Sequence, residues 1–199
     1  MDVVALDRIA VQEATRLVEL AGDDGDWARE TPCAGWDLRR LVAHMTAQHH
    51  GFAAAARGEG GAAAHWREPG DLREPARAHR AAATAVLAAF AEPGAAGREF
   101  MLPELGGAFA GRTAIAFHFV DHVVHAWDVA AALGVRPRLA GEVLGAAAVV
   151  ARRVPTDPAG RGPGFAFAPA LKVPERAGPL EETLRLLGRE PQAWPGTGV

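Results

Sequence analysis

The chain has 199 residues, a formal net charge of −3 and a pI near 6.2, and its residues are 49% hydrophobic and 23% charged. This composition is ordinary for a globular domain with a substantial core, and the scattered arginines form no basic tract of the kind that binds nucleic acid. The sequence shows neither a secretory signal nor an apolar run that could span a bilayer, so we expect a cytoplasmic protein without nucleic-acid or membrane partners.

Alanine-rich segments with helical spacing predict a mainly α-helical fold. The predicted helices span about residues 5–21, 38–57, 71–90, 114–133, 141–154 and 180–188. Asp37 is suited to cap the start of the second helix, and Gly22 and Gly134 are suited to end the first and the fourth. Two short apolar pieces around a Gly-Gly turn at 98–111 predict an irregular hairpin that caps one end of the bundle.

The segments differ in character along the chain. We expect residues 1–154 to form a helical bundle that carries a metal site, and residues 155–199 to form an appendage. The appendage is rich in Gly and Pro and contains a short extended piece, FAFAPALKVP, before its helix. Because it is too small for a core of its own, it should pack on the bundle, which makes the chain one domain.

The single cysteine, Cys33, limits the chemistry that the chain can use. One cysteine excludes an internal disulfide and a cysteine-rich zinc site, so histidines and carboxylates must hold any metal. Cys33 lies in the turn sequence TPCAGW, and no base lies near it along the chain. We therefore do not expect it to be a nucleophile.

The segment Ala114–Leu133 contains no Lys, Arg or Glu, but it holds three histidines and two aspartates. On a helix, His118, Asp121, His125 and Asp128 fall within roughly 80° of one another, and apolar side chains cover much of the remaining circumference. Imidazole and carboxylate groups four residues apart can bind one metal ion. An amphipathic helix that uses His and Asp on its wet side explains the pattern equally well, so this helix alone leaves both interpretations open.

Other histidines lie on the neighbouring predicted helices. His44 lies at the edge of the apolar stripe of helix 38–57, from which it could reach the interior of a bundle. Before other observations it could equally be a surface residue beside His49 and His50. His79, on helix 71–90, is expected to serve packing or the surface rather than a metal.

Three motifs occur together in the chain: TPCAGWDLRRLVAHM at 31–45, FVDHVVHAWDVA at 119–130 and FAPALKVPERAGPLEETLRLLGREPQAW at 167–194. In this combination and order they resemble the actinobacterial metal-binding proteins related to mycothiol-dependent maleylpyruvate isomerase, within the DinB-like superfamily. The resemblance covers nearly the whole chain. It implies an all-α, DinB-like four-helix bundle with a short hairpin and a small C-terminal strand and helix appendage.

In that family a histidine of the second helix, and a carboxylate or histidine followed four residues later by a histidine, hold one divalent ion. Carried over by motif, the ligands are His44, Asp121 and His125. The carboxylate position is often Glu in the isomerase branch, so the shorter Asp121 would lie farther from the metal. His118 and His122 remain spare ligands, and His122 could replace Asp121 if the helix were slightly rotated. Zinc is the expected ion, and Ni, Fe or Mn are alternatives.

Three protein ligands leave coordination positions open, as in a catalytic zinc site. The resemblance implies an enzyme that activates a low-molecular-weight thiol, with mycothiol as a cosubstrate, for transfer to or isomerisation of a small electrophile. A non-catalytic metal-binding carrier or sensor, and a thiol-independent isomerase or cyclase that uses the ion as a Lewis acid, remain alternatives. Asp128 could orient a histidine through its other ring nitrogen or lie at the surface. A homodimer through exposed bundle faces is also plausible.

Overall fold

The computed structural model describes residues 1–22, 25–33, 35–70, 72–162 and 166–194. Within these ranges six α-helices and one two-stranded antiparallel sheet form, which confirms the mainly helical fold with a short hairpin. They are α1 (Val3–Ala21), α2 (Leu38–Ala56), α3 (Pro75–Phe90), β1 (Glu99–Leu102), β2 (Gly107–Ala110), α4 (Gly111–Leu133), α5 (Gly141–Ala151) and α6 (Pro179–Leu186). None of the described helices is long and apolar enough to cross a membrane.

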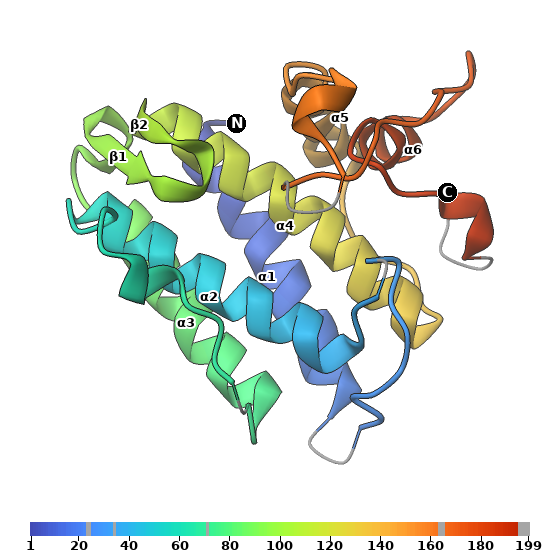
Figure 1. Ribbon diagram of the computed structural model, residues 1–199, viewed down its shortest axis with the longest axis horizontal. Coiled ribbons are helices and arrows are strands. Elements are labelled where there is room, and N and C mark those ends of the chain that lie inside the picture. Colours follow the sequence, from blue (N-terminus) through green and yellow to red (C-terminus); the bar gives the residue numbers. More distant parts are fainter. Residues whose placement is uncertain (23–24, 34, 71, 163–165, 195–199) are drawn as a thin grey trace.

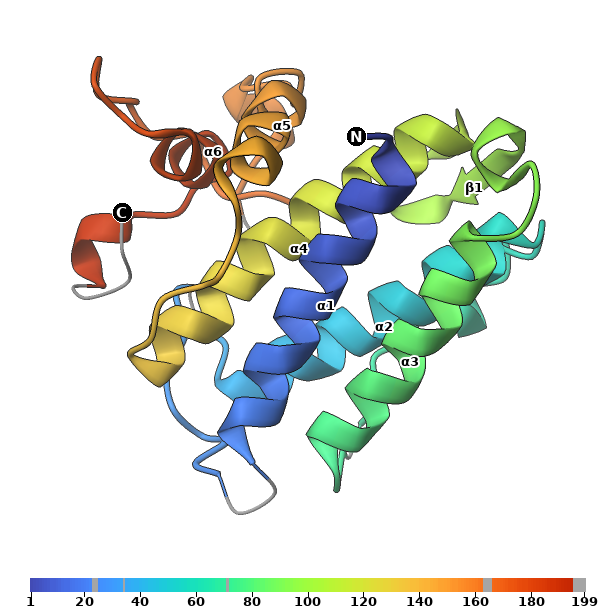
Figure 2. The same ribbon diagram turned by 180° about the vertical axis from the view of Figure 1, so that it is seen from behind.

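Helices α1 to α4 form a four-helix bundle (Figure 1). α1 packs on α3 and α4, and α2 packs on α3 and α4, so the four helices enclose a common core. Helix α4 is buried around most of its circumference, because α5 and α6 cover the side that faces away from the bundle, as the reverse view also shows (Figure 2). This position explains why the sequence of α4 contains so few long charged side chains.

Local sequence signals set the helix ends. The carboxylate of Asp2 accepts a hydrogen bond from the backbone N–H of Ala5 at 2.8 Å, and Asp37 caps α2 in the same way through Arg40 N–H, also at 2.8 Å. Gly134 ends α4 in the left-handed conformation with φ 68°. The helix predicted from residue 71 begins at Pro75, a residue suited to the first helical position, and Asp71 lies outside the described residues.

The predicted hairpin is present and lies against α2 and α4 at one end of the bundle. Phe100 of β1 pairs with Phe109 of β2, and the Phe100 side chain is fully buried. Gly106, in the left-handed conformation with φ 71°, follows the short 3₁₀ turn that links the strands. The hairpin thus closes the bundle where α4 begins.

The C-terminal segment packs on the outside of the bundle through α5 and α6. Leu184 of α6 and Leu187 just after it are fully buried in one apolar cluster with Val123 and Trp127 of α4. The described part of the extended piece, residues 166–174, pairs with no strand among the described residues. It is tied to α6 instead, by a 2.8 Å bond from Leu171 N–H to the carbonyl oxygen of Arg185, and Phe165 lies outside the described residues.

Candidate metal centre

The first predicted ligand, His44, lies on the flank of α2 that faces α4. Its Nδ1 lies 3.1 Å from Glu68 Oε1, and its ring centroid lies 5.0 Å from that of Trp36. The His44 side chain is 21% exposed, so the ring is at the boundary between core and solvent. Because a carboxylate accepts, the hydrogen of this bond lies on Nδ1, and Nε2 is the ring nitrogen left for another partner.

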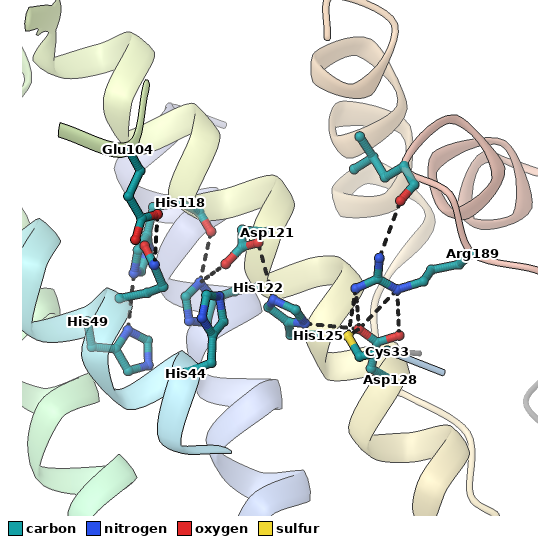
Figure 3. A network of polar contacts seen from close by, with 12 residues as sticks. Cys33, His44, His49, Glu104, His118, Asp121, His122, His125, Asp128 and Arg189 are labelled. Atoms are coloured by element: carbon teal, nitrogen blue, oxygen red, sulfur yellow. Dashed lines mark hydrogen bonds and ion pairs between the residues drawn. The ribbon is translucent and has the colours of Figure 1, made fainter. Parts of the chain in front are cut away.

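The other two predicted ligands, Asp121 and His125, follow one another on successive turns of α4. His125 Nε2 lies 3.3 Å from Asp121 Oδ1, and the His125 ring stands edge-on to that of His44, with centroids 5.5 Å apart. One potential ligand atom from each of the three residues lies within 4.8 Å of the others. The structure therefore brings His44, Asp121 and His125 together across the α2–α4 interface (Figure 3). The Asp121 side chain is 27% exposed, which leaves this group open on one side.

The charges of Asp121 and His125 support one another. Burial disfavours both charged forms, but His125 holds the pKa of Asp121 well below its ordinary value. In return, although burial opposes it, the carboxylates of Asp121 and Asp128 raise the pKa of His125 well above its ordinary value. Without a metal, His125 is an imidazolium between two carboxylates. A donor set of two imidazoles and one carboxylate fits a divalent ion of the zinc type, which would take the place of the Nε2 proton.

Asp128 orients His125 from behind, which decides between the two roles that the sequence left open. The carboxylate is fully buried and accepts a hydrogen bond from His125 Nδ1 at 2.9 Å. Arg189, just beyond α6, binds both of its oxygens, with Nε 3.0 Å from Oδ1 and Nη2 2.9 Å from Oδ2. Burial works against ionisation, but Arg189 and His125 lower the pKa of Asp128 to about 2. Asp128 is therefore charged at neutral pH and fixes the His125 ring with Nε2 toward Asp121.

Cys33 lies beside this carboxylate, although no partner was visible along the sequence. Its Sγ is 3.3 Å from Asp128 Oδ2 and 2.9 Å from Arg189 Nη2. Burial and the Asp128 charge raise the pKa of the Cys33 thiol above its ordinary value. The thiol therefore stays protonated and donates to Asp128, in agreement with the expectation that it is not a nucleophile.

The other two histidines of α4 belong to a different group. His118 Nδ1 lies 2.6 Å from Asp7 Oδ1, and His122 Nδ1 donates to the carbonyl oxygen of His118 at 2.9 Å. His118 Nε2 lies 3.1 Å from Nδ1 of His49, a fully buried residue of α2. The stripe on α4 thus does not converge on one point. The structure groups Asp121, and neither His118 nor His122, with His44 and His125.

Comparison with known proteins assigns the chain to a family. The family model described as the mycothiol maleylpyruvate isomerase N-terminal domain matches residues 8–130. The chain belongs to this family. Two Mycobacterium tuberculosis proteins, "Uncharacterized protein MT0763" of strain CDC 1551 / Oshkosh and "Uncharacterized protein Rv0738" of strain ATCC 25618 / H37Rv, are each 32% identical to it over 169 residues. Each alignment covers 80% of this chain and 82% of the relative. No solved structure matches the chain.

Membership in the mycothiol maleylpyruvate isomerase N-terminal domain family bears out the resemblance and places the chain in a DinB-like group associated with metal binding. The matched region runs from α1 into the last turns of α4 and includes all three predicted ligands. It ends before Arg189, so the residue that anchors Asp128 comes from the part of the chain beyond the family domain.

Two supporting residues, Glu68 and Arg189, were not assigned a role from the sequence, although Arg189 lies within the motif at 167–194. Glu68 follows a short 3₁₀ helix in the connection between α2 and α3, where a charged residue ordinarily means a solvated loop. Arg189 contacts Asp128 across 61 positions of sequence. Contacts of this range depend on how the connection and the tail fold back, and periodicity does not report that.

Proposed function

We propose that this protein binds a divalent cation, zinc in the first place, through His44, Asp121 and His125, and uses it to activate a low-molecular-weight thiol of the mycothiol type. The activated thiol would be transferred to a small electrophile or would catalyse its isomerisation. The observation that carries the proposal is the meeting of three ligand side chains from α2 and α4 at a point that is open on one side. Membership in the mycothiol maleylpyruvate isomerase N-terminal domain family supports the choice of thiol.

The donor set is that of a catalytic site rather than a structural one. Structural zinc sites use four protein ligands, usually with cysteine, whereas three histidine or carboxylate ligands leave at least one position for a small molecule. A divalent ion in this place would favour the thiolate form of a bound thiol at neutral pH. The partial exposure of His44 and Asp121 leaves a side from which the thiol can approach.

The residues behind the ligands prepare the site. Glu68 and Asp128 each accept the Nδ1 hydrogen of one histidine, so both rings turn Nε2 toward the shared point, and a metal ion would displace the Nε2 proton of His125. Asp128 is held by Arg189, which fixes the orientation of the His125 ring. Because these positions are set before a ligand arrives, little ordering is required on binding.

Addition of such a thiol to an electrophile needs no oxidant. Addition of a thiolate to an activated double bond forms a carbon–sulfur bond and places the electron pair on the electrophile. Protonation of that product completes a transfer. Rotation about the former double bond, followed by elimination of the thiolate, instead returns the thiol and releases the isomerised compound.

Metal analysis tests the site directly. Protein purified without an affinity tag or chelator should contain zinc, and His44→Ala and His125→Ala should each lower the metal content by one equivalent per chain. His50→Ala is the matched control, because His50 is an exposed histidine on the same helix. If the two alanine variants keep the metal content of the parent, the proposed site is wrong.

Turnover separates the enzyme from the other functions. The metal-loaded protein should consume a maleyl-type electrophile only when mycothiol is present, and His125→Ala should abolish that consumption. Turnover without thiol would indicate a Lewis-acid isomerase or cyclase instead. Thiol binding without turnover across a panel of electrophiles would indicate a carrier or sensor.

A further inference from the structure

A second group of histidines lies in the core, farther toward the start of α4. We call His49, His118 and His122 the core histidine cluster. All three side chains are fully buried, and one potential ligand atom from each lies within 4.8 Å of the others. His79 of α3 is also fully buried, and its ring centroid is 4.9 Å from that of His49. Figure 3 shows His49 and His118 on the side of His44 away from His125, and in this view the ring of His122 overlaps that of His44.

Hydrogen bonding fixes the tautomers of the two histidines on α4. His118 Nδ1 is engaged by Asp7, and His122 Nδ1 donates to a backbone carbonyl. Both residues therefore keep the lone pair on Nε2. His118 Nε2 accepts from His49 Nδ1, which leaves His49 with its own lone pair on Nε2.

The lone pairs of His49 Nε2 and His122 Nε2 find no hydrogen-bond donor in the interior. Among the described residues, eight buried side-chain nitrogen and oxygen atoms have no hydrogen-bond partner, and five of them lie here: Asp7 Oδ2, His49 Nε2, both ring nitrogens of His79 and His122 Nε2. Native interiors rarely leave even a few buried polar atoms unpaired. The unpaired nitrogens of His49 and His122 belong to one cluster, and they indicate a missing partner that accepts lone pairs.

The charge of the surroundings favours a cation as that partner. Asp7 lies against the cluster with its side chain fully buried, and its Oδ1 is 2.6 Å from His118 Nδ1. A divalent cation would bring positive charge close to this carboxylate through the His118 ring.

We propose that the core histidine cluster is a second metal site, which binds a divalent transition metal through three imidazole nitrogens. All-imidazole sites suit zinc, nickel and copper rather than magnesium or calcium. His79 stands beside the cluster and would supply a fourth imidazole, and Asp7 orients His118. Since no ligand side chain is exposed, the site is closed, in contrast to the open group formed by His44, Asp121 and His125. The rings of His49 and His122 are stacked, with centroids 4.3 Å apart and planes at 16°, so at least one ring must rotate to coordinate. Coordination by His118 Nε2 also requires that His49 Nδ1 give up its bond to that atom.

The test uses the metal alone and does not depend on the function proposed above. Metal-free protein is unfolded in urea and refolded with Zn²⁺, desalted and analysed for metal per chain. The same protein is also loaded in its native state, in which the buried ligands have no direct contact with solvent. Refolding should give two zinc ions per chain, whereas brief native loading should give one.

Variants assign the two ions. The double variant His44→Ala/His125→Ala, which keeps all three residues of the core histidine cluster, should still bind one ion on refolding. The variant His122→Gln should lose one ion and keep the open site, and the exposed-residue variant His50→Gln should keep both.

A cobalt experiment tests the core histidine cluster without changing any of its residues, so it remains informative if His122→Gln misfolds. Co²⁺ refolded into His44→Ala/His125→Ala should give the strong visible absorption of a tetrahedral nitrogen site. If that double variant binds neither Zn²⁺ nor Co²⁺, the core histidine cluster is no metal site and buried water satisfies its nitrogens. A failure of the proposed function alone looks different, because His122→Gln would then bind no metal and the double variant would keep one ion.

Discussion

Asp128→Asn tests whether the residues behind the ligands control the metal. In the structure Asp128 Oδ2 accepts from His125 Nδ1 at 2.9 Å, and the Arg189 guanidinium contacts both oxygens at about the same distance. Asparagine keeps the size and shape of the side chain but removes its charge. If its oxygen takes the place of Oδ2, it can still accept from His125 Nδ1 and Arg189 Nη2, but its NH₂ group then faces the donor Arg189 Nε, so Arg189 loses one bond and its counter-charge.

Two effects of different size follow. Removal of a carboxylate that orients a metal-binding histidine typically weakens metal binding about 10- to 100-fold, which is about 1.4 to 2.7 kcal/mol. In the metal-free protein, Arg189 loses its counter-charge while its side chain is only 11% exposed. Breaking a buried ion pair by removing one partner costs about 3 to 5 kcal/mol. We therefore expect a larger loss in the free energy of unfolding than in the free energy of metal binding.

Competition with a chromophoric chelator measures the zinc affinity, and urea unfolding of the metal-free protein measures the stability. Glu175→Gln serves as the control, because it makes the same carboxylate-to-amide change at an exposed position. A double-mutant cycle with Arg189→Met should show coupling of at least about 1 kcal/mol, as residues in one ion-pair network do. Unchanged zinc affinity together with unchanged unfolding in Asp128→Asn would refute the reasoning.

Three further predictions concern the site and its surroundings. Glu68→Gln should weaken zinc binding by no more than about tenfold in the same competition assay, because the bond to His44 lies near solvent; a loss larger than that of Asp128→Asn would contradict this ranking. In the metal-free protein, burial lowers the pKa of His79 to about 3. The unfolded chain binds this proton more readily, so the contribution to the free energy of unfolding is complete above about pH 6.5. This contribution, of the order of 4 kcal/mol, is lost as the pH falls toward 3. Urea unfolding across that range should show a shallower pH dependence for His79→Leu, and an identical slope would count against the argument. Gly51→Ala places a Cβ in steric overlap with the ring of Trp66, so we expect the free energy of unfolding, measured by thermal unfolding, to fall by about 1 to 3 kcal/mol. Gly145→Ala is the control and should show no such loss, because nothing lies near the added carbon.

The helices themselves follow from local physics, and the sequence therefore predicted them well. Asp37 caps α2 because its short carboxylate reaches a backbone N–H of the first turn, whatever lies around it. Gly134 ends α4 because it adopts the left-handed conformation without a steric penalty. The lack of Lys, Arg and Glu along most of α4 likewise indicated a helix that is buried on nearly every side.

The sequence also pointed to His44, Asp121 and His125 as one group, but it reached that trio through a family motif rather than through periodicity. On the helix alone, His118 and Asp128 shared the stripe with Asp121 and His125. The angular position of a residue determines which face of the helix it lies on, whereas the packing of neighbouring segments determines which side chains it contacts. His118 is hydrogen-bonded to Asp7 of α1, and Asp128 forms an ion pair with Arg189 of the C-terminal segment. The His125 ring packs against the ring of His44 on α2.

Only the tertiary structure showed that the histidines divide between an open group and a buried one. His49 lies on the apolar stripe of α2 and His79 on an alanine-rich helix, and nothing within either helix distinguishes them from packing residues. Their meeting with His118 and His122 depends on the packing of three helices that are far apart in the chain. Helix formation depends on neighbours within about four residues, so a sequence reveals it directly. The sharing of lone pairs and protons among α1 to α4 depends on distances that exist only after the bundle has closed.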